Sequence, residues 1–352
     1  MEQNFHYHGT YTAAVMAGFS PEDALVIARA AQYVDDCDGE TVQGNSSIFW
    51  SNMRDVVPGW EKEILTILDI WPVFHFLPGD FTSIRPYVDP QLLTSTRPCE
   101  WMAPKLICGT ESRLTRAIVD GARLYYNDST PPHIQKLQRI GVTMHVLADT
   151  FAHQGFAGIP LSLINEATSV RQAEPGGDLR RKLYVFSPAG YSERSFGYLG
   201  HGRMGHLPDQ PGETFTYCAA WRNQARDGWM IRYNPLEFYC AYIQMTESME
   251  YILGKRTQFS NAVDREYLLD RRRGWPVARH FLEALEEAGS DRKFPAPWYA
   301  VVGAVKPPAD YKPYDPAADS ALRQSFIAVA HDHRDLVTGQ CGPLREYRGL
   351  FC

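Results

Sequence analysis

The sequence predicts an all-α protein, a single helical domain in which long loops join the helices. Three observations support this fold class. Apolar residues recur at intervals of three and four positions in several segments, which is the spacing of a buried helix face. Prolines stand where helices can begin, as in Ser20-Pro21 and Pro131-Pro132. Strand-like alternation of apolar and polar residues is scarce, and the sequence contains no internal repeat.

The first half of the chain carries most of the helical signals. Apolar spacing predicts helices over residues 5–17 and 111–127. Ser20-Pro21-Glu22-Asp23 combines a capping serine, a proline and an acidic first turn, and the helix that follows ends at Tyr33-Val34-Asp35-Asp36. Residues 40–110 contain scattered proline, glycine, serine and asparagine, so long loops with brief helices are expected there.

The second half predicts fewer regular elements. Residues 155–220 are rich in glycine and proline, which indicates loops. A strongly apolar helix is expected over residues 235–253, where a proline follows Asn234. The tail beyond residue 255 contains a charged helix, a proline-rich linker and a last helix, over residues 276–288, 294–316 and 318–334.

The composition limits the classes of function. With 352 residues, of which 44% are hydrophobic and 12% aromatic, the chain can bury a sizeable core. A net charge of −6 argues against an extended nucleic-acid-binding surface, but it does not exclude a small phosphoester as a substrate. The sequence contains no run of 18 or more apolar residues, so we expect no transmembrane segment.

The chain start and the cysteines bear on the compartment. Residues 1–8 lack the basic and apolar regions of a secretory signal, so a cytoplasmic protein is expected, with a processed secreted form as the alternative. The seven cysteines are odd in number and form no CxxC pair. They are therefore expected to be dispersed thiols rather than disulfides or thiolate zinc ligands. The oligomeric state does not follow from these observations.

The strongest chemical signal is a helix that carries His145, Asp149 and His153. Side chains four residues apart drift by only about 40° around a helix, so these three share one face. Two imidazoles and a carboxylate on one rigid element are a suitable start for a metal site. A purely structural polar network is the alternative, although burying three such groups without partners would cost several kcal/mol.

Other candidate ligands stand in short clusters elsewhere. Asp35 and Asp36 end a predicted helix, where the macrodipole disfavours anions and a cation would relieve the cost. A solvated helix end is the alternative for this pair. His6 and His8 lie in a start segment that contains enough aromatic residues to be packed in place. His75 lies in an aromatic loop with prolines on both sides.

Glycines frame two further candidate ligands, His201 and His206, with Asp209 shortly after them. Glycine permits positive φ and close backbone approach, so these histidines can point inward from a loop. A surface turn with incidental histidines is the alternative. His133 and His280 are expected to be structural or solvent-exposed, and His331-Asp332-His333 is expected to lie on a solvated helix face. Consecutive helical residues point about 100° apart, so the last segment is not expected to be a ligand cluster.

These motifs together resemble the zinc-dependent phospholipase C and single-strand-specific zinc nuclease superfamily. The resemblance rests on the His-x-x-x-Asp-x-x-x-His helix with Gly141 before it. It implies an all-α fold and an N-terminal ligand, an aspartate after the first helices and a histidine in an aromatic loop. One departure is that the superfamily's second helical pair, His-x-x-x-Glu, has no counterpart here.

A closer resemblance is to an uncharacterised microbial family that carries only a domain-of-unknown-function label. It rests on four motifs within roughly residues 1–250: Phe-His-Tyr, Gln-Tyr-Val-Asp-Asp, Ala-Asp-Thr-Phe-Ala-His-Gln-Gly-Phe and the glycine-histidine loop that ends in Pro-Asp. The tail adds little to this resemblance.

We therefore expect a metal-dependent hydrolase, acting on a phosphoester or other small molecule, with two or three zinc ions or alternatively iron or manganese. Asp149 and Asp36 are the expected catalytic residues. The expected metal ligands are His6, His8, Asp35, Asp36, His75, His145, Asp149, His153, His201 and His206. Arg203 and Arg222 are candidates for substrate binding. Residues 1–254 would form the metal-binding catalytic domain, and residues 255–352 a helical extension packed on it. The alternatives are a non-haem iron oxygenase and a metal-stabilised protein without catalysis.

Overall fold

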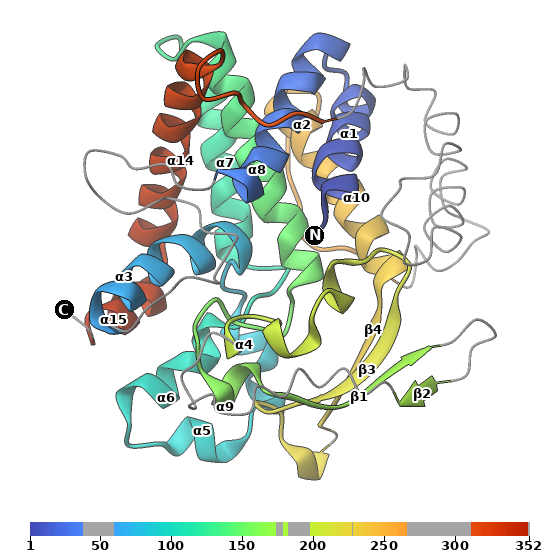
Figure 1. The fold of residues 1–352 in the computed structure, drawn as a ribbon, viewed down its shortest axis with the longest axis vertical. Coiled ribbons are helices and arrows are strands. Elements are labelled where there is room, and N and C mark those ends of the chain that lie inside the picture. The colour runs from blue at the N-terminus through green and yellow to red at the C-terminus, as the bar shows by residue number, and fades with distance from the viewer. Residues whose placement is uncertain (38–59, 174–178, 182–197, 227, 266–310, 351–352) are drawn as a thin grey trace.

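A bundle of long helices forms one half of the molecule, and a small sheet with several short helices forms the other (Figure 1). The computed structural model describes residues 1–37, 60–173, 179–181, 198–226, 228–265 and 311–350. The long helices are α1 (Thr10–Ala17), α2 (Pro21–Asp36), α7 (Arg113–Asn127), α8 (His133–Ala152), α10 (Asn234–Ile252) and α14 (Ser320–Gln340). This arrangement confirms a mainly helical fold.

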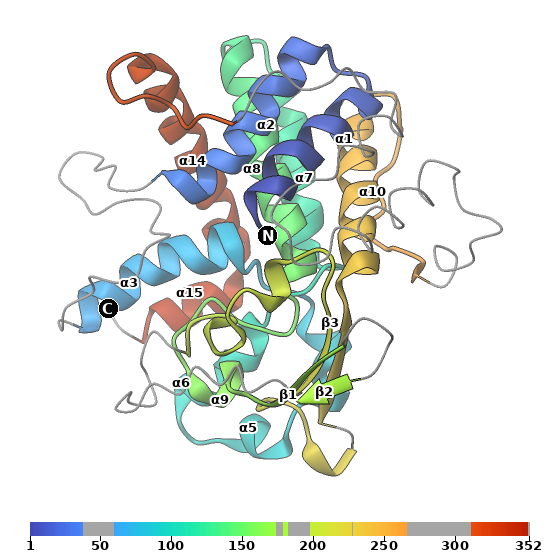
Figure 2. The ribbon, with the colours of Figure 1, turned by 45° about the vertical axis from the view of Figure 1, so that its right-hand side comes forward.

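Helix α8 is the centre of the bundle. It packs against α2, α7, α10 and α14, and both views show it surrounded by them (Figure 2). All its residues from Leu137 to Ala152 are buried, which is the pattern of a helix covered on every side. Gly141 allows the closest of these contacts. A Cβ at this position would lie 2.4 Å from the carbonyl oxygen of Ile27 on α2.

The helix starts follow the signals in the sequence. Ser20 caps α2 by accepting a hydrogen bond from the backbone N–H of Asp23 at 3.1 Å, and Pro21 is the first helical residue. Ser112 caps α7 in the same way, through the N–H of Thr115 at 3.0 Å. Helix α8 begins directly after Pro132. The helices predicted around these signals are confirmed.

Short helices connect the long ones, as expected for much of residues 40–110. They are α3 (Trp60–Ile70), η3 (Trp71–His75), α4 (Phe81–Ile84), η4 (Arg85–Tyr87), α5 (Pro90–Thr94), α6 (Pro98–Met102) and η5 (Ala103–Leu106). Residues 38–59 lie outside the described part. The chain start forms η1 (Asn4–Gly9), and η1 and η3 are both π-helical. The later short helices are α9 (Ser162–Asn165), η7 (Gly202–Met204), η8 (Leu207–Asp209), η9 (Gln224–Arg226) and α15 (Gly342–Arg348).

A four-stranded antiparallel sheet occupies part of the region that we expected to be loops. Its strands are β1 (Ala167–Ala173), β2 (Leu179–Arg181), β3 (Thr214–Ala219) and β4 (Trp229–Tyr233), in the order β2-β1-β3-β4. Strand β3 is buried at most positions, so it lacks the alternation that reveals a half-exposed strand. The register between β1 and β3 shifts between Thr168 and Arg171, where Ser169 has a φ of 54°. These two features explain why the sequence did not predict the sheet.

Helix α14 packs against the bundle from the C-terminal side. Gln138 of α8 donates to the carbonyl of Leu322 at 3.0 Å, and Arg29 of α2 donates to Asp319 at 2.6 Å. The helix predicted over residues 318–334 is therefore α14, which begins close to the predicted start but extends to Gln340. The predicted charged helix at 276–288 lies outside the described residues, as does the predicted linker up to residue 310. No helix within the described ranges is long and apolar enough to cross a membrane.

One expectation about α14 was wrong. Asp332 is half-exposed, as a solvated helix face requires, but His333 is fully buried. The step of about 100° between consecutive residues turns His333 toward the bundle while Asp332 stays at the rim. His133 fits its expectation, because it is 62% exposed and pairs with Asp23 at 2.9 Å. His280 lies outside the described residues.

Candidate metal centre

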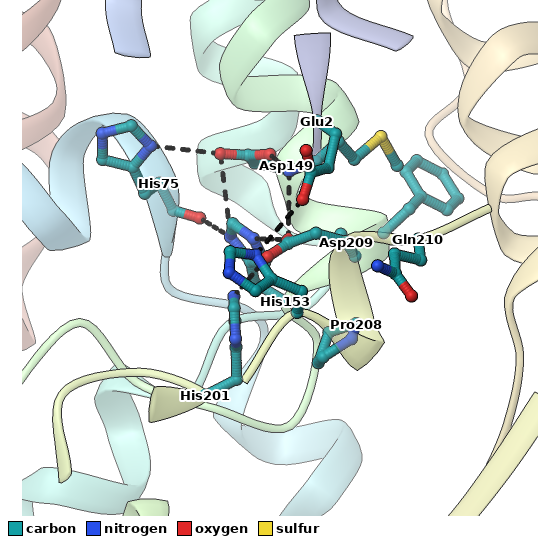
Figure 3. Close-up of polar contacts among 12 residues, drawn as sticks. Glu2, His75, Asp149, His153, His201, Pro208, Asp209 and Gln210 are labelled. Atoms are coloured by element: carbon teal, nitrogen blue, oxygen red, sulfur yellow. Dashed lines mark hydrogen bonds and ion pairs between the residues drawn. The ribbon is translucent and has the colours of Figure 1, made fainter. Parts of the chain in front are cut away.

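Histidine and aspartate side chains from five parts of the chain meet at the C-terminal end of α8 (Figure 3). Helix α8 contributes His145 and Asp149, and His153 is its C-cap residue. We name the first group, in which His6, Asp35, His75 and His145 surround Asp149, the Asp149 cluster. The second group, His153, His201 and Asp209, is the Asp209 cluster. Two of the histidines, His6 and His75, come from the π-helical segments η1 and η3, a rare geometry that is frequent at functional sites.

Three ligand atoms of the Asp149 cluster form a nearly equilateral triangle. Asp149 Oδ2 lies 3.2 Å from His75 Nδ1 and 3.2 Å from His145 Nε2. The two imidazole nitrogens are 3.3 Å apart. Asp35 Oδ1 lies 3.8 Å from each of the two imidazole nitrogens. His75 and His145 therefore lie within 3.8 Å of two carboxylates that are potential ligands.

These separations can be compared with those around a metal ion. Zinc–ligand bonds of about 2.0 to 2.1 Å in a tetrahedron place neighbouring ligand atoms about 3.3 to 3.4 Å apart. Octahedral coordination with bonds of the same length would place them about 2.8 to 3.0 Å apart. The observed edges of 3.2 and 3.3 Å are closer to the tetrahedral value. The donor set and its spacing both fit a zinc-type ion.

The other oxygen of Asp149 faces a different set of groups. Oδ1 lies 3.1 Å from His6 Nε2 and 2.6 Å from the amino group of Met1. The His6 ring stacks on His145 with centroids 3.8 Å apart. Among the described residues, neither nitrogen of His6 makes a hydrogen bond, although Nε2 points at the carboxylate. A buried nitrogen without a hydrogen bond, directed at an anion, is suited to bind a cation.

The Asp209 cluster has the hydrogen-bond pattern that is typical of metal-ligating histidines. His153 Nδ1 lies 2.6 Å from the carbonyl oxygen of His75, and His201 Nδ1 lies 2.9 Å from that of Gly205. A carbonyl oxygen only accepts, so both Nδ1 atoms carry the proton. The Nε2 atoms then face Asp209, at 2.9 Å from His153 and 3.3 Å from His201.

This arrangement requires a cation or an extra proton between His153 and Asp209. A neutral His153 with its proton on Nδ1 presents a lone pair to the carboxylate, which also presents a lone pair. The 2.9 Å separation suits a hydrogen bond from an imidazolium, and a metal ion would have to widen it by about 0.4 Å. Burial lowers the pKa of His153, which favours the neutral form.

Burial dominates the ionisation of the site. It lowers the pKa of His6 well below its usual value, so this imidazole is neutral and can bind a metal ion. It raises the pKa of Asp35, although that side chain remains 26% exposed. Burial would also raise the pKa of Asp149, but His153 and the amino group of Met1 hold it well below its usual range. Asp149 is therefore the fixed anion of its cluster.

The charges of the second cluster are linked in a similar way. Burial would raise the pKa of Asp209, but His201 and the Met1 amino group hold it well below its usual value. Burial would lower the pKa of His201, but Asp209 raises it above its usual value. Burial would lower the pKa of the Met1 amino group too, but Asp149 and Asp209 raise it to about 11. This amino group lies 3.3 Å from Asp209, so a positive charge joins the two clusters.

A buried arginine fixes the end of α8 at the site. The guanidinium of Arg232 on β4 donates to the carbonyls of Phe151 at 2.7 Å, Ala152 at 3.1 Å and Gln154 at 3.2 Å. These carbonyls end the helix and have no partner within it, and a cation is favoured at this end of the macrodipole. The sheet thereby sets the position of the last helical turn, from which His153 projects.

A buried asparagine holds the loop that carries Asp209. The Asn234 amide donates to the carbonyls of Leu207 and Gln210, both at 2.8 Å. Asn234 is the first residue of α10, so the loop is attached to the helix bundle. Nearby, Gly200 has a φ of 55° and lies against the ring of Phe76, where a Cβ would be 2.1 Å from a ring carbon. The glycine before His201 is thus required by both conformation and space.

The comparisons with known proteins give one match. The model of DUF6765, described as a family of unknown function, matches residues 1–328. The chain belongs to this family. The match confirms the resemblance to a family labelled only as a domain of unknown function, and it extends that resemblance beyond residue 250. No curated protein and no solved structure matches the chain. The resemblance to the phospholipase C and nuclease superfamily stays a prediction.

The structure brings seven of the ten predicted metal ligands into the two clusters and leaves three outside them. Those in the clusters are His6, Asp35, His75, His145, Asp149, His153 and His201. Asp36, also expected to be catalytic, is exposed and accepts a hydrogen bond from Gln32 at 3.4 Å. His8 is half-buried beside the Tyr7 ring. His206 is 69% exposed and pairs with Glu2 at 3.2 Å.

The two predicted substrate arginines have partners within the fold. Arg203 Nε lies 2.9 Å from Glu166, and its guanidinium lies near the Tyr198 ring. Arg222 donates to the carbonyl of Trp229 at 2.6 Å and lies over the ring of Tyr87. These contacts give both arginines a structural use, which the sequence did not indicate.

Sequence reasoning omitted Asp209 from the ligands. The aspartate lies between His153 and His201, whereas the histidine three residues before it points outward. A signal was present, because Asp209 is the only acidic residue near these histidines and Pro208 restricts the turn before it. The sequence does not reveal which way each side chain of a loop points.

Proposed function

We propose that the protein is a metal-dependent hydrolase that cleaves a phosphoester with two or three zinc-type ions. The observation that carries this proposal is the triangle of Asp149 Oδ2, His75 Nδ1 and His145 Nε2, with edges of 3.2 to 3.3 Å. Asp35 would be a fourth ligand. Iron or manganese would fit the same donors.

The two oxygens of Asp149 suit a bridging role. Oδ2 faces His75 and His145, while Oδ1 faces His6. The Asp209 cluster would hold a further ion through His153, His201 and Asp209. Bound ions of this kind lower the pKa of a coordinated water to about 7 and neutralise charge on phosphoryl oxygens. The same donor arrangement on α8 supports an all-α fold of the phospholipase C and nuclease type.

The open side of the site is where a substrate would enter. Among the residues of the two clusters, Asp35 is 26% exposed, His201 15% and Asp209 13%, whereas His6 and His145 are completely buried. The two arginines predicted to bind substrate already have partners: Arg203 pairs with Glu166, and Arg222 donates to the carbonyl of Trp229. The positive charge that stabilises a phosphoester would therefore come from the ions.

A second function is favoured by one specific feature. Two histidines and one carboxylate on one face also form the ligand set of non-haem iron oxygenases. The two functions differ in the metal that they require and in their consumption of oxygen. Protein that contains iron, consumes oxygen and hydrolyses no phosphoester would favour the oxygenase.

Metal analysis of protein purified without added metal tests the proposal. We expect at least one zinc-type ion per chain, its loss in His145→Ala and Asp149→Ala, and its retention in His133→Ala. The last variant is a matched control, because His133 lies on the same helix but is 62% exposed. Hydrolysis of p-nitrophenyl phosphate and of its diester should then be sensitive to chelators. Only trace metal in wild-type protein, or full occupancy in His145→Ala, would contradict the proposal.

A further inference from the structure

Helix α14 places one histidine directly behind the candidate metal centre. The His333 side chain is fully buried, and its Nε2 lies 3.2 Å from the carbonyl oxygen of Val73 in η3. Its ring lies near that of Phe74, with centroids 5.3 Å apart. His333 therefore contacts the two residues that precede His75.

A buried arginine determines which nitrogen of His333 carries the proton. Arg139 of α8 is completely buried and donates from Nη1 to Thr143 at 2.8 Å and to His333 Nδ1 at 2.9 Å. Its Nε lies 3.1 Å from Asp332. Because arginine only donates, His333 Nδ1 must accept. The proton of a neutral His333 is thus on Nε2, where it can be donated to the Val73 carbonyl.

The segment that His333 contacts determines the positions of two ligand candidates. The His75 side chain faces Asp149 at 3.2 Å. The carbonyl of the same residue accepts from His153 Nδ1 at 2.6 Å, and this bond orients the second imidazole toward Asp209. A displacement of η3 would therefore move one ligand and release the other.

We propose that His333 is a positioning residue of the metal centre: with its proton fixed on Nε2 by Arg139, it holds the Val73 carbonyl and thereby orients His75 and His153. The part of this inference that concerns metal binding rests on the proposed function. It assigns a role at the site to α14, which follows the predicted catalytic region in the sequence. It also explains why a guanidinium is buried beside this histidine.

Two substitutions separate positioning from packing. Glutamine has an amide nitrogen that can donate to Val73 and an amide oxygen that can accept from Arg139, so His333→Gln should preserve the contacts. Leucine fills a similar volume but has neither group. Ser325→Ala is the matched control, because it removes another bond between α14 and α8, from Ser325 Oγ to Gln138 at 2.6 Å, without contact to η3.

Cobalt titration of the three variants and the wild type measures the metal-dependent effect. Loss of a residue that orients a ligand typically weakens metal binding by about 10 to 100-fold. We expect this loss and an altered visible absorption spectrum of Co²⁺ in His333→Leu. Affinity and spectrum should be close to wild type in His333→Gln and Ser325→Ala. Wild-type affinity and spectrum in His333→Leu, or an equal loss in Ser325→Ala, would overturn the positioning role.

Imidazole nitrogen NMR of metal-free protein tests the inference independently of metal binding. In wild type, His333 should be protonated on Nε2 and His153 on Nδ1. In His333→Leu, the proton of His153 should no longer be confined to Nδ1, and in His333→Gln it should stay on Nδ1. This measurement separates failure of the proposed metal-dependent function from failure of the positioning role of His333. If the wild type binds no metal, the protonation of His333 and His153 still tests the positioning role. Protonation of wild-type His333 on Nδ1 would overturn the inference even if the leucine variant does not fold.

Discussion

Replacing Gly141 by alanine should destabilise the protein, although alanine is the better helix former. Within a helix this exchange usually gains about 1 kcal/mol. Here the added Cβ would lie 2.4 Å from the carbonyl oxygen of Ile27, 2.7 Å from the Cβ of Ala30 and 3.0 Å from the nitrogen of Ala31. All three atoms belong to α2, and two are backbone atoms, which no side-chain rotation can move away.

The size of the effect follows from these distances. Restoring even a tight 3.0 Å contact with the Ile27 oxygen requires α2 to move from α8 by about 0.6 Å. Overpacking of this kind costs about 1 to 3 kcal/mol. After the gain of about 1 kcal/mol in helix propensity, we expect a net loss of up to about 2 kcal/mol. Asp35 lies on the displaced helix, so its distance of 3.8 Å from His145 should increase and metal affinity should fall.

Urea unfolding of three alanine variants provides the measurement and its controls. Gly339 on α14 has no atom within 4 Å of an added Cβ, so Gly339→Ala should be neutral or stabilising by up to about 0.5 kcal/mol. At Gly121 the one contact shorter than 3.4 Å would be with the tip of the Leu336 side chain at 2.4 Å, which can rotate, so we expect a change within about 0.5 kcal/mol. If Gly141→Ala is as stable as these two, close packing of α2 on α8 does not limit this position.

Three further predictions concern the ends of helices and the ions. Arg232→Met should lower the free energy of unfolding in urea by about 2 to 4 kcal/mol, since the carbonyls of Ala152 and Gln154 lose this donor and that of Phe151 keeps only the Gln154 amide; an unchanged midpoint would contradict this. Ser20→Ala should cost about 0.5 to 2 kcal/mol in the same assay because the cap of α2 is lost, and stability equal to wild type would show that the cap contributes nothing. Removal of metal by a chelator should lower the melting temperature, since one site filled at a hundred times its Kd contributes about 2.7 kcal/mol, and His145→Ala should not respond to the chelator.

Local signals in the sequence predicted the helices well because those signals are short-ranged. Ser20 and Pro21 mark the start of α2, and Pro132 precedes α8, without reference to the rest of the chain. The sheet depends on contacts between distant segments. Strand β3 pairs with β1 and β4, and its buried surface gives it no alternation, so its residues look like those of any apolar segment.

The same distinction applies to the site. The shared helical face of His145 and Asp149 follows from their spacing alone and was predicted. The choice of Asp35 over Asp36 depends on how α2 is rotated against α8, and that rotation does not follow from the sequence of α2 alone. The role of Asp209 depends on a loop held by Asn234, which lies on another helix. The role of His333 likewise requires knowledge of what α14 packs against.

The burial of Arg139 has a consequence for synthesis on the ribosome. The partners of its guanidinium on α14, Asp332 and His333, are translated long after α8 itself. Until these residues are made, burying the Arg139 guanidinium would cost several kcal/mol, because the charge would leave water without gaining a partner. The nascent chain should therefore keep α8 accessible on this side, with Arg139 in water. Final closure of the bundle, and with it the fixed geometry of the metal centre, would come only after α14 has been made.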